Sequence, residues 1–168
     1  ALHSEKSRML TIREFVDFLE LLKSGNVLNG LEQKLPGNEA LAIYEKITKK
    51  EDPVRAEWLD ADFKVIDNRL YINYNHRNIN GQLKPEDSEL LERCIMEDCY
   101  VDLFSANKQG LPITKSRKQD FYLWYPRSDN NSVAWFGANS DRVGLNCYWG
   151  PQSSFPALGV RRAKKIKT

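Results

Sequence analysis

The sequence has few of the residues that build metal centres and disulfide frameworks. Its three cysteines are Cys94, Cys99 and Cys147, and an odd number of cysteines cannot form a fully paired framework. Its two histidines, His3 and His76, supply a four-ligand zinc site poorly. We therefore expect no metal, no cofactor and three reduced, mostly buried thiols, with pairing of Cys94 and Cys99 left open.

Strong charge and long apolar runs are also missing. The formal net charge is only +2, whereas general nucleic-acid binders carry a larger and clustered positive excess. No stretch reaches the run of about 18 apolar residues that a membrane span needs, and residues 1–6 lack the apolar core of a signal peptide. The five basic residues between 161 and 167 fit a terminal strand with a solvated end better than a nucleic-acid or membrane tail. These absences predict no nucleic-acid partner and no transmembrane segment.

Two helices are predicted near the start of the chain, which at 168 residues fits one domain over residues 1–168. Thr11 and Glu14 form a capping-box pattern, and apolar residues follow at helical spacing as far as Leu22, before Gly25. A second helix is expected over residues 38–48, with Asn38 as its cap.

The middle of the chain alternates strand and loop signals. Two runs rich in β-branched and aromatic residues, Trp58–Val65 and Leu70–Tyr74, flank the turn-prone pair at residues 67–68 and predict a strand pair. Further expectations are a loop over 75–81, a helix from Pro85 to Ile95, a strand over 100–104 and a loop over 108–118.

The composition changes abruptly near residue 119. The chain has 26 Lys and Glu residues, so an even distribution would place about seven in the 45 residues from Gln119 to Ala163, which contain none. That segment also lacks Met, Ile, Thr and His, and instead holds three Trp and three Tyr among Asn, Asp, Ser and Gly. Binding surfaces favour aromatic rings with small polar residues, since rings give contact area at low entropic cost. A Trp-rich β-core with few long charged side chains is the alternative interpretation.

Alternation within this segment separates two sets of side chains. In residues 142–149 one parity is Val, Leu, Cys and Trp, and the other is Arg, Gly, Asn and Tyr, which predicts a strand with one buried side. The same reasoning places Trp135 inward and Phe136 outward. The exposed side would carry Tyr125, Phe136, Asn146 and Tyr148, next to loops over 127–132 and 139–141, and clustered exposed aromatics indicate a binding site.

Three short stretches resemble a known family. They are residues 121–126 (Phe-Tyr-Leu-Trp-Tyr-Pro), the pair Ala134-Trp135, and residues 157–161 (Ala-Leu-Gly-Val-Arg). Together they resemble the C-terminal signature of C-type-lectin-fold variable proteins diversified by retroelements, most of all the archaeal branch. In that family an error-prone reverse transcriptase rewrites template adenines, and AAY codons can become most residue types but never Lys, Glu, Gln, Met or Trp. The missing Lys, Glu and Met agree with this rule.

The resemblance implies roles for individual residues and a location at a cell or virion surface. The ligand-binding variable region would span residues 119–163, and the ligand would be an unknown protein or cell-surface group. The positions expected to vary are Tyr125, Arg127, Asp129, Asn130, Phe136, Asn139, Asp141, Asn146 and Tyr148. The positions expected to form the fixed scaffold are Trp124, Trp135, Trp149, Gly159 and Arg161.

The fold class predicted from pattern and resemblance together is α+β and C-type-lectin-like. N-terminal helices would pack on a small, mostly antiparallel sheet, with long irregular connections in the C-terminal part. The function predicted is hypervariable ligand recognition or adhesion without catalysis; the alternative is a non-variable lectin-like or structural assembly domain.

Two chemical functions fit the sequence less well. Calcium-dependent sugar binding needs convergent oxygen ligands, and the C-terminal segment offers Asp129 and Asp141 but no Glu. An enzyme needs a nucleophile with a base, a metal or a tuned acid–base pair, and this segment has no His. A carboxylate cluster at Asp60, Asp62 and Asp67 is interpreted as solvated or turn-forming.

Overall fold

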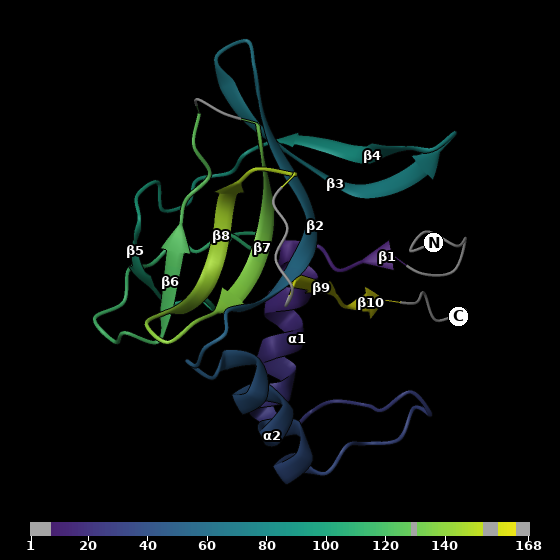
Figure 1. Ribbon diagram of the computed structural model, residues 1–168, viewed down its shortest axis with the longest axis vertical. Helices are drawn as coiled ribbons and strands as arrows, with labels where there is room; N and C mark the ends of the chain where they lie inside the picture. The colour runs from purple at the N-terminus through teal and green to yellow at the C-terminus, as the bar shows by residue number, and fades with distance from the viewer. Residues whose placement is uncertain (1–7, 129–130, 153–157, 164–168) are drawn as a thin grey trace.

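An eight-stranded mixed sheet dominates the computed structural model, which describes residues 8–128, 131–152 and 158–163 (Figure 1). Seven strands follow the order β4-β3-β2-β7-β8-β6-β5, β9 pairs with β2, and β1 pairs with β10 in a separate ribbon. The elements in chain order are β1 Arg8–Met9, α1 Ile12–Ser24, α2 Gly37–Thr48, β2 Arg55–Ile66, β3 Arg69–Ile79, β4 Gln82–Leu90, β5 Cys99–Val101, β6 Phe121–Trp124, β7 Ser132–Ala138, β8 Val143–Trp149, β9 Leu158–Val160 and β10 Arg162–Ala163.

Helix α1 forms as the sequence predicts. The Thr11 side chain accepts a hydrogen bond from the Glu14 backbone, the Glu14 side chain accepts one from the Thr11 backbone, and Gly25 ends the helix at φ 71°. Its apolar stripe is buried against the sheet, with Phe15 and Leu19 at most 1% exposed. Helix α2 begins after Pro36, not at a capping Asn38, and it buries only Ala40 fully.

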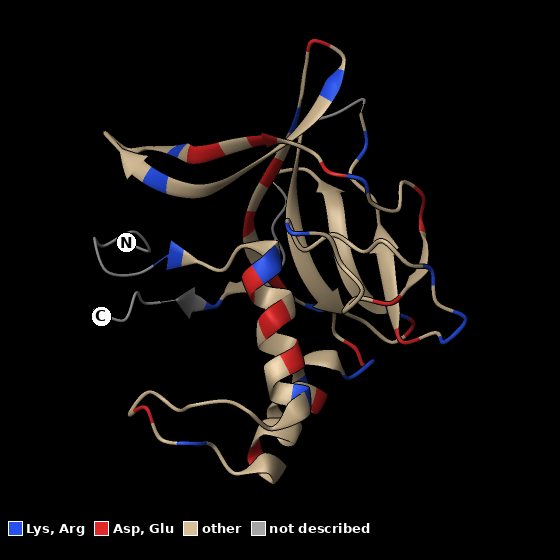
Figure 2. Ribbon diagram, turned by 180° about the vertical axis from the view of Figure 1, so that it is seen from behind, with Lys and Arg blue, Asp and Glu red and all other residues tan. Residues whose placement is uncertain are grey.

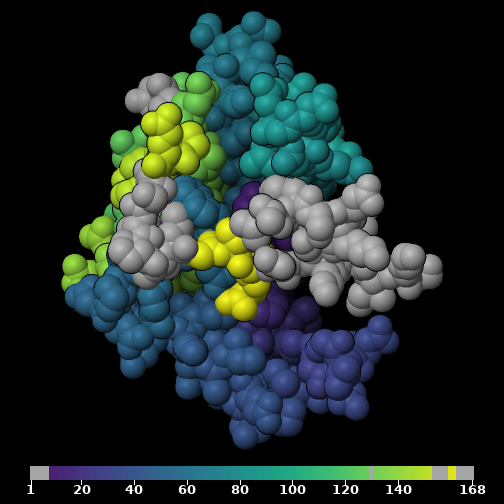
Figure 3. All heavy atoms as spheres, turned by 45° about the vertical axis from the view of Figure 1, so that its right-hand side comes forward, coloured from purple at the N-terminus to yellow at the C-terminus, as the bar shows by residue number. Residues whose placement is uncertain are grey.

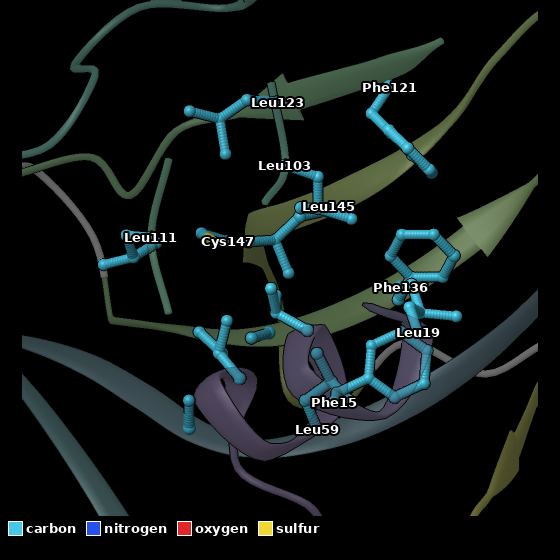
Figure 4. Packing of buried hydrophobic residues seen from close by; sticks show 14 of the residues in the cluster. Phe15, Leu19, Leu59, Leu103, Leu111, Phe121, Leu123, Phe136, Leu145 and Cys147 are labelled. Carbon is cyan, nitrogen blue, oxygen red and sulfur yellow. The ribbon is translucent and has the colours of Figure 1, made fainter. Parts of the chain in front are cut away.

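The hydrophobic core lies between α1 and one face of the sheet. Figure 4 shows Leu145 and Phe136 pointing from β8 and β7 toward the helix, where the Phe136 and Phe15 rings lie 4.9 Å apart. Phe121 joins them from β6, with its ring centre 6.3 Å from that of Phe136. Because α1 covers this face, the opposite face of β5, β6, β7 and β8 is the outer face, which is turned toward the viewer in Figure 1.

Two consecutive hairpins build the other half of the sheet. The predicted strand pair is confirmed as β2 and β3, joined at Asp67 and Asn68, which both have positive φ. The predicted loop over 75–81 and helix from Pro85 are wrong, because β3 continues to Ile79, turns at Asn80-Gly81 and returns as β4. The resulting β3–β4 arm stands away from β8, as the teal and yellow-green spheres of Figure 3 show.

The predicted fold class is wrong. Only two helices occur among the described residues, and the C-terminal part consists mainly of strands that pair with the centre of a large sheet. The C-type-lectin-like fold is therefore not supported. The physical reason is nonlocal pairing: besides its hairpin partner β3, β2 pairs with β7 and β9, and no local pattern reveals those two partners. Neither described helix has the length and apolar character to cross a membrane.

Candidate binding face

The strand registers decide which aromatic side chains leave the core. In β6, Phe121 and Leu123 are buried in the core, so Tyr122 and Trp124 project from the outer face, where both are half-buried. Tyr100 of β5 lies opposite Tyr122 in the antiparallel register and shares that face. On the other side of β6, the parallel strand β8 places Gly144 beside Tyr122.

The rings on this part of the outer face form one connected cluster. The Tyr100 and Tyr122 ring centres lie 5.0 Å apart and those of Tyr122 and Trp124 4.8 Å apart, both in edge-to-face geometry. The Arg142 guanidinium lies 4.1 Å from the Tyr122 ring centre. Each such ring pair contributes about 0.5–1.5 kcal/mol beyond area burial. We call Tyr100, Tyr122, Trp124 and Arg142 the aromatic face.

A glycine allows this face to form. A Cβ atom on Gly144 would lie 1.8 Å from the backbone oxygen of Tyr122. Any side chain at this position would force β6 and β8 apart. The close approach therefore fixes the placement of Tyr122 under Arg142.

A second cluster lies where the parallel strands β6 and β8 end. The Arg127 guanidinium lies 4.1 Å from the Tyr148 ring centre and 5.6 Å from that of Tyr125. Asp98 accepts a hydrogen bond from Arg127 Nη2 at 3.2 Å and another from the Tyr125 backbone at 3.2 Å. Three residues predicted to vary, Tyr125, Arg127 and Tyr148, therefore meet at one place, which we call the Arg127 cluster.

Phe136 was predicted to bind the ligand, but it is not accessible. Phe136 is 2% exposed and belongs to the core, while its neighbour Trp135 points to the outer face, so the predicted orientations of these two residues are both wrong. Trp135 meets Trp149 with ring centres 5.6 Å apart and lies over Gly137. Both parities of β7 carry a large aromatic residue, so alternation could not tell them apart.

Asn146 faces outward but is only 2% exposed. It lies between Trp124 and Trp135 in the registers of β6 and β7, and its Oδ1 accepts a hydrogen bond from the Tyr148 backbone at 3.1 Å. Its predicted exposure is wrong, because large aromatic neighbours on both adjacent strands cover a short side chain.

The remaining predicted residues are spread over the fold. Asn139 shapes the β7–β8 turn, where its Oδ1 accepts hydrogen bonds from the backbones of Asp141 and Arg142 at 2.9 and 2.7 Å. Asp141 is exposed in the same turn. Gly159 pairs with Glu57, and Arg161 donates to that carboxylate at 2.9 and 2.6 Å. Asp129 and Asn130 lie outside the described residues.

Sequence reasoning missed a buried ionic cluster between β2 and β3. His76 Nδ1 lies 2.5 Å from Asp60 Oδ1, and His76 Nε2 lies 2.9 Å from Asp62 Oδ2. The three side chains are 9%, 1% and 18% exposed, and Asn73 donates to Asp62 Oδ1 at 2.6 Å. The interpretation of Asp60 as solvated is therefore wrong, whereas Asp67 does lie in the turn.

Burial of the imidazole disfavours its charge, but the hydrogen bonds to Asp60 and Asp62 outweigh that effect and raise the pKa of His76 to about 9. For Asp62, burial raises the pKa, yet its bonds to His76 and Asn73 hold it below its usual range. Both imidazole nitrogens are engaged, so His76 serves as a structural cation and offers no free nitrogen for proton transfer. The Asp-x-Asp spacing on one strand was the available signal, although its partner is remote in sequence.

The three thiols are unpaired, so Cys94 and Cys99 do not form a disulfide. Burial raises the pKa of Cys94 to about 11 and that of Cys147 well above its ordinary value. Thiols held in the protonated form are poor nucleophiles. Within residues 8–128, 131–152 and 158–163, no group of three or more His, Cys, Asp or Glu side chains could hold a metal ion.

Comparison with known protein families, with characterised proteins and with solved structures found no match to this chain.

Proposed function

We propose that this chain is a recognition domain that binds a macromolecular partner through the aromatic face. The observation that carries the proposal is the connected set of Tyr100, Tyr122, Trp124 and Arg142 on the sheet surface opposite the core. These rings lie outside the hydrophobic core, on the face of the sheet that α1 does not cover. Such rings, half-buried against each other and still accessible, are typical of binding surfaces.

The composition of the face supports a protein partner. Tyr, Trp and Arg are the residues that most often dominate binding energy at protein interfaces, whereas Lys and Glu are depleted there. Strands β6, β7 and β8 carry no charged side chain, which Figure 2 shows as an uncoloured region of the sheet. The aromatic face therefore has an apolar centre, with Arg142 at its edge.

Binding is a better proposal than catalysis for the described residues. His76 uses both ring nitrogens, and burial raises the pKa of each cysteine. His76 therefore does not act as a free base, and the cysteines are not activated as nucleophiles.

We also propose that a retroelement diversified this protein. This part of the proposal rests on the three short motifs that resemble the variable-protein family and on the absence of Lys and Glu from residues 119–163. Arg127 and Tyr148 of the Arg127 cluster are positions where variation would change the surface, whereas Tyr125 also packs against the hydrophobic core. Variation at Phe136 or Asn146 would disturb packing, so we propose that these two positions stay fixed. The genomic test is a near-identical repeat of the 3′ coding region beside a reverse transcriptase gene. The proposal requires the two copies to differ at template adenines; identical copies or no repeat would remove this part of it.

Selection from a peptide and protein display library tests the binding function. We expect the wild-type domain to enrich specific clones and the Tyr122→Ser variant to lose them, because removing a central ring from an interface costs about 2 kcal/mol or more. The matched control is Ile79→Ser on the β3–β4 arm, where Ile79 is 46% exposed and distant from the face in sequence and sheet order.

The control should retain every clone that the wild type enriches, and both variants should keep the wild-type circular dichroism spectrum. Equal enrichment by wild type and Tyr122→Ser would contradict the proposal. If the wild type forms a stable homo-oligomer and the Tyr122→Ser variant is a monomer, the aromatic face serves self-assembly instead.

A further inference from the structure

We propose that the partner presents a carboxylate to Arg142 and, two residues away in an extended segment, an apolar or aromatic side chain to Trp124. This inference rests on the proposed binding function and names the chemistry of its partner. It follows from the charge of Arg142, from the way its guanidinium is held, and from its position relative to Trp124.

Arg142 is held in place but not neutralised. Its guanidinium stacks on Tyr122 at 4.1 Å, and its backbone is fixed by Asn139, which accepts from its amide at 2.7 Å and donates to its carbonyl at 2.9 Å. The donors of a guanidinium lie in its plane, so stacking on a ring leaves its N–H groups available at the edge. Among the described residues, Arg142 forms no ion pair, and none of the ion pairs joins it to Asp141 in the same turn.

Two other arginines that lie over aromatic rings, Arg127 and Arg161, differ in this respect. Arg127 also stacks on a tyrosine, but Asp98 already lies 3.2 Å from its guanidinium. Arg161 approaches the Phe18 ring at 5.2 Å and is bonded to Glu57. Arg142 thus combines a preorganised guanidinium with an unmet positive charge, and a planar fork of donors is best matched by a carboxylate.

The strand register sets the spacing of the two contacts. Tyr122, whose ring lies under the Arg142 guanidinium, and Trp124 are two residues apart on the same face of β6, and their ring centres lie 4.8 Å apart. Side chains two residues apart in an extended peptide lie on one side of it, about 7 Å apart, which is short enough to reach neighbouring groups on one sheet face. A partner segment with an acidic residue and, two positions before or after it, an apolar or aromatic residue would therefore reach both the Arg142 guanidinium and the Trp124 ring.

Nucleic acid fits this geometry less well. Affinity for a phosphate backbone comes from many basic contacts, whereas the aromatic face has a single unneutralised arginine and the chain a net charge of only +2. A single-stranded oligonucleotide is therefore included in the test as a competing ligand.

The experiment is a selection of random peptides on the wild-type domain, followed by titration calorimetry of an enriched peptide at physiological salt. We expect enrichment of Asp or Glu two positions from an aromatic or large apolar residue. Arg142→Gln should weaken binding of that peptide about 10- to 100-fold, as loss of a charge-assisted hydrogen bond does. Arg142→Lys should recover only part of it, because an ammonium cannot reproduce the planar fork.

Charge exchange and a matched control make the test specific. Arg142→Glu should bind a peptide with Lys in place of the acidic residue better than it binds the original peptide. The control is Arg69→Gln: Arg69 is exposed at the start of β3 and forms none of the ion pairs of the described residues, so this variant should bind as the wild type does. Melting curves of all variants should coincide.

The outcomes separate the two proposals. Enriched peptides without an acidic residue, or an unchanged affinity in Arg142→Gln, would overturn the carboxylate contact and leave the proposed function standing. Failure of the wild type to enrich any peptide would count against the proposed function itself. Tight binding of an oligonucleotide that Arg142→Gln abolishes would overturn the protein partner.

Discussion

Protonation of His76 should make the stability of this protein depend on pH in the alkaline range. The imidazole is clamped between Asp60 and Asp62 and its side chain is only 9% exposed. Its pKa rises from 6.5 in the unfolded chain to about 9 in the folded one. At about 1.4 kcal/mol per pKa unit, the cluster contributes about 3 kcal/mol, an order-of-magnitude figure.

Proton linkage gives the direction in which the stability changes with pH. Because the folded-state pKa is the higher one, the folded protein binds more protons between pH 6.5 and about 9. The stabilisation is complete below pH 6.5 and is lost as the pH rises through about 9. Two further charges face the cluster: the Asp60 carboxylate helps to raise the pKa of Arg8, and Lys64 helps to lower the pKa of Asp62.

Urea unfolding of wild type and His76→Gln at about pH 6 and about pH 9.5 measures this contribution. The wild type should lose about 3 kcal/mol more than the variant between the two pH values, since all other titrating groups are common to both. At about pH 6 the substitution itself should cost about 3–5 kcal/mol, because it leaves Asp60 buried without its cation. Parallel pH profiles for the two proteins would refute the clamped imidazolium.

Three further predictions concern core packing, a close strand contact and a helix cap. Phe136→Ala should destabilise the domain by about 3–5 kcal/mol in urea unfolding, and Trp124→Ala by clearly less, because Phe136 fills the core and Trp124 lies on the outer face; the reverse order would contradict the placement of Phe136 in the core and of Trp124 outside it. Gly144→Ala should cost about 1–3 kcal/mol by forcing a Cβ against the Tyr122 carbonyl, while Gly30→Ala, which has open space, should cost little; equal melting temperatures would count against the close approach. Thr11→Ala should cost about 1 kcal/mol through loss of the cap to Glu14, and an unchanged unfolding midpoint would show that the capping box is dispensable.

Local signals in the sequence identified the elements whose structure is local. Helix α1 is specified by its own cap, its apolar stripe and Gly25, and the β2–β3 turn by Asp67-Asn68. The β3–β4 arm was missed although Asn80-Gly81 is a strong hairpin signal. Pro85 and its charged neighbours fit a helix start, and only pairing with β3 makes them a strand.

The candidate site could be predicted only in part for the same reason. The aromatic and small polar composition of residues 119–163 indicated the segment that supplies Tyr122, Trp124 and Arg142 of the proposed binding face, but the face that Trp135 and Phe136 occupy depends on registers with β2 and β8. Tyr100, which completes the aromatic face, comes from outside that region. His76 and Asp60 are 16 residues apart, and the strand pair predicted from the sequence ended at Tyr74, which left His76 in a loop; its contact with Asp60 was therefore not predicted.

Backbone and indole NMR signals of the ¹⁵N-labelled domain, followed while a selected ligand is added, test the central claim most directly. The resonances of Tyr100, Tyr122, Trp124 and Arg142 should shift together, and those of the β3–β4 arm and α2 should stay in place. Shifts confined to the arm or to α2, with the aromatic face unaffected, would contradict the assignment of this surface to binding.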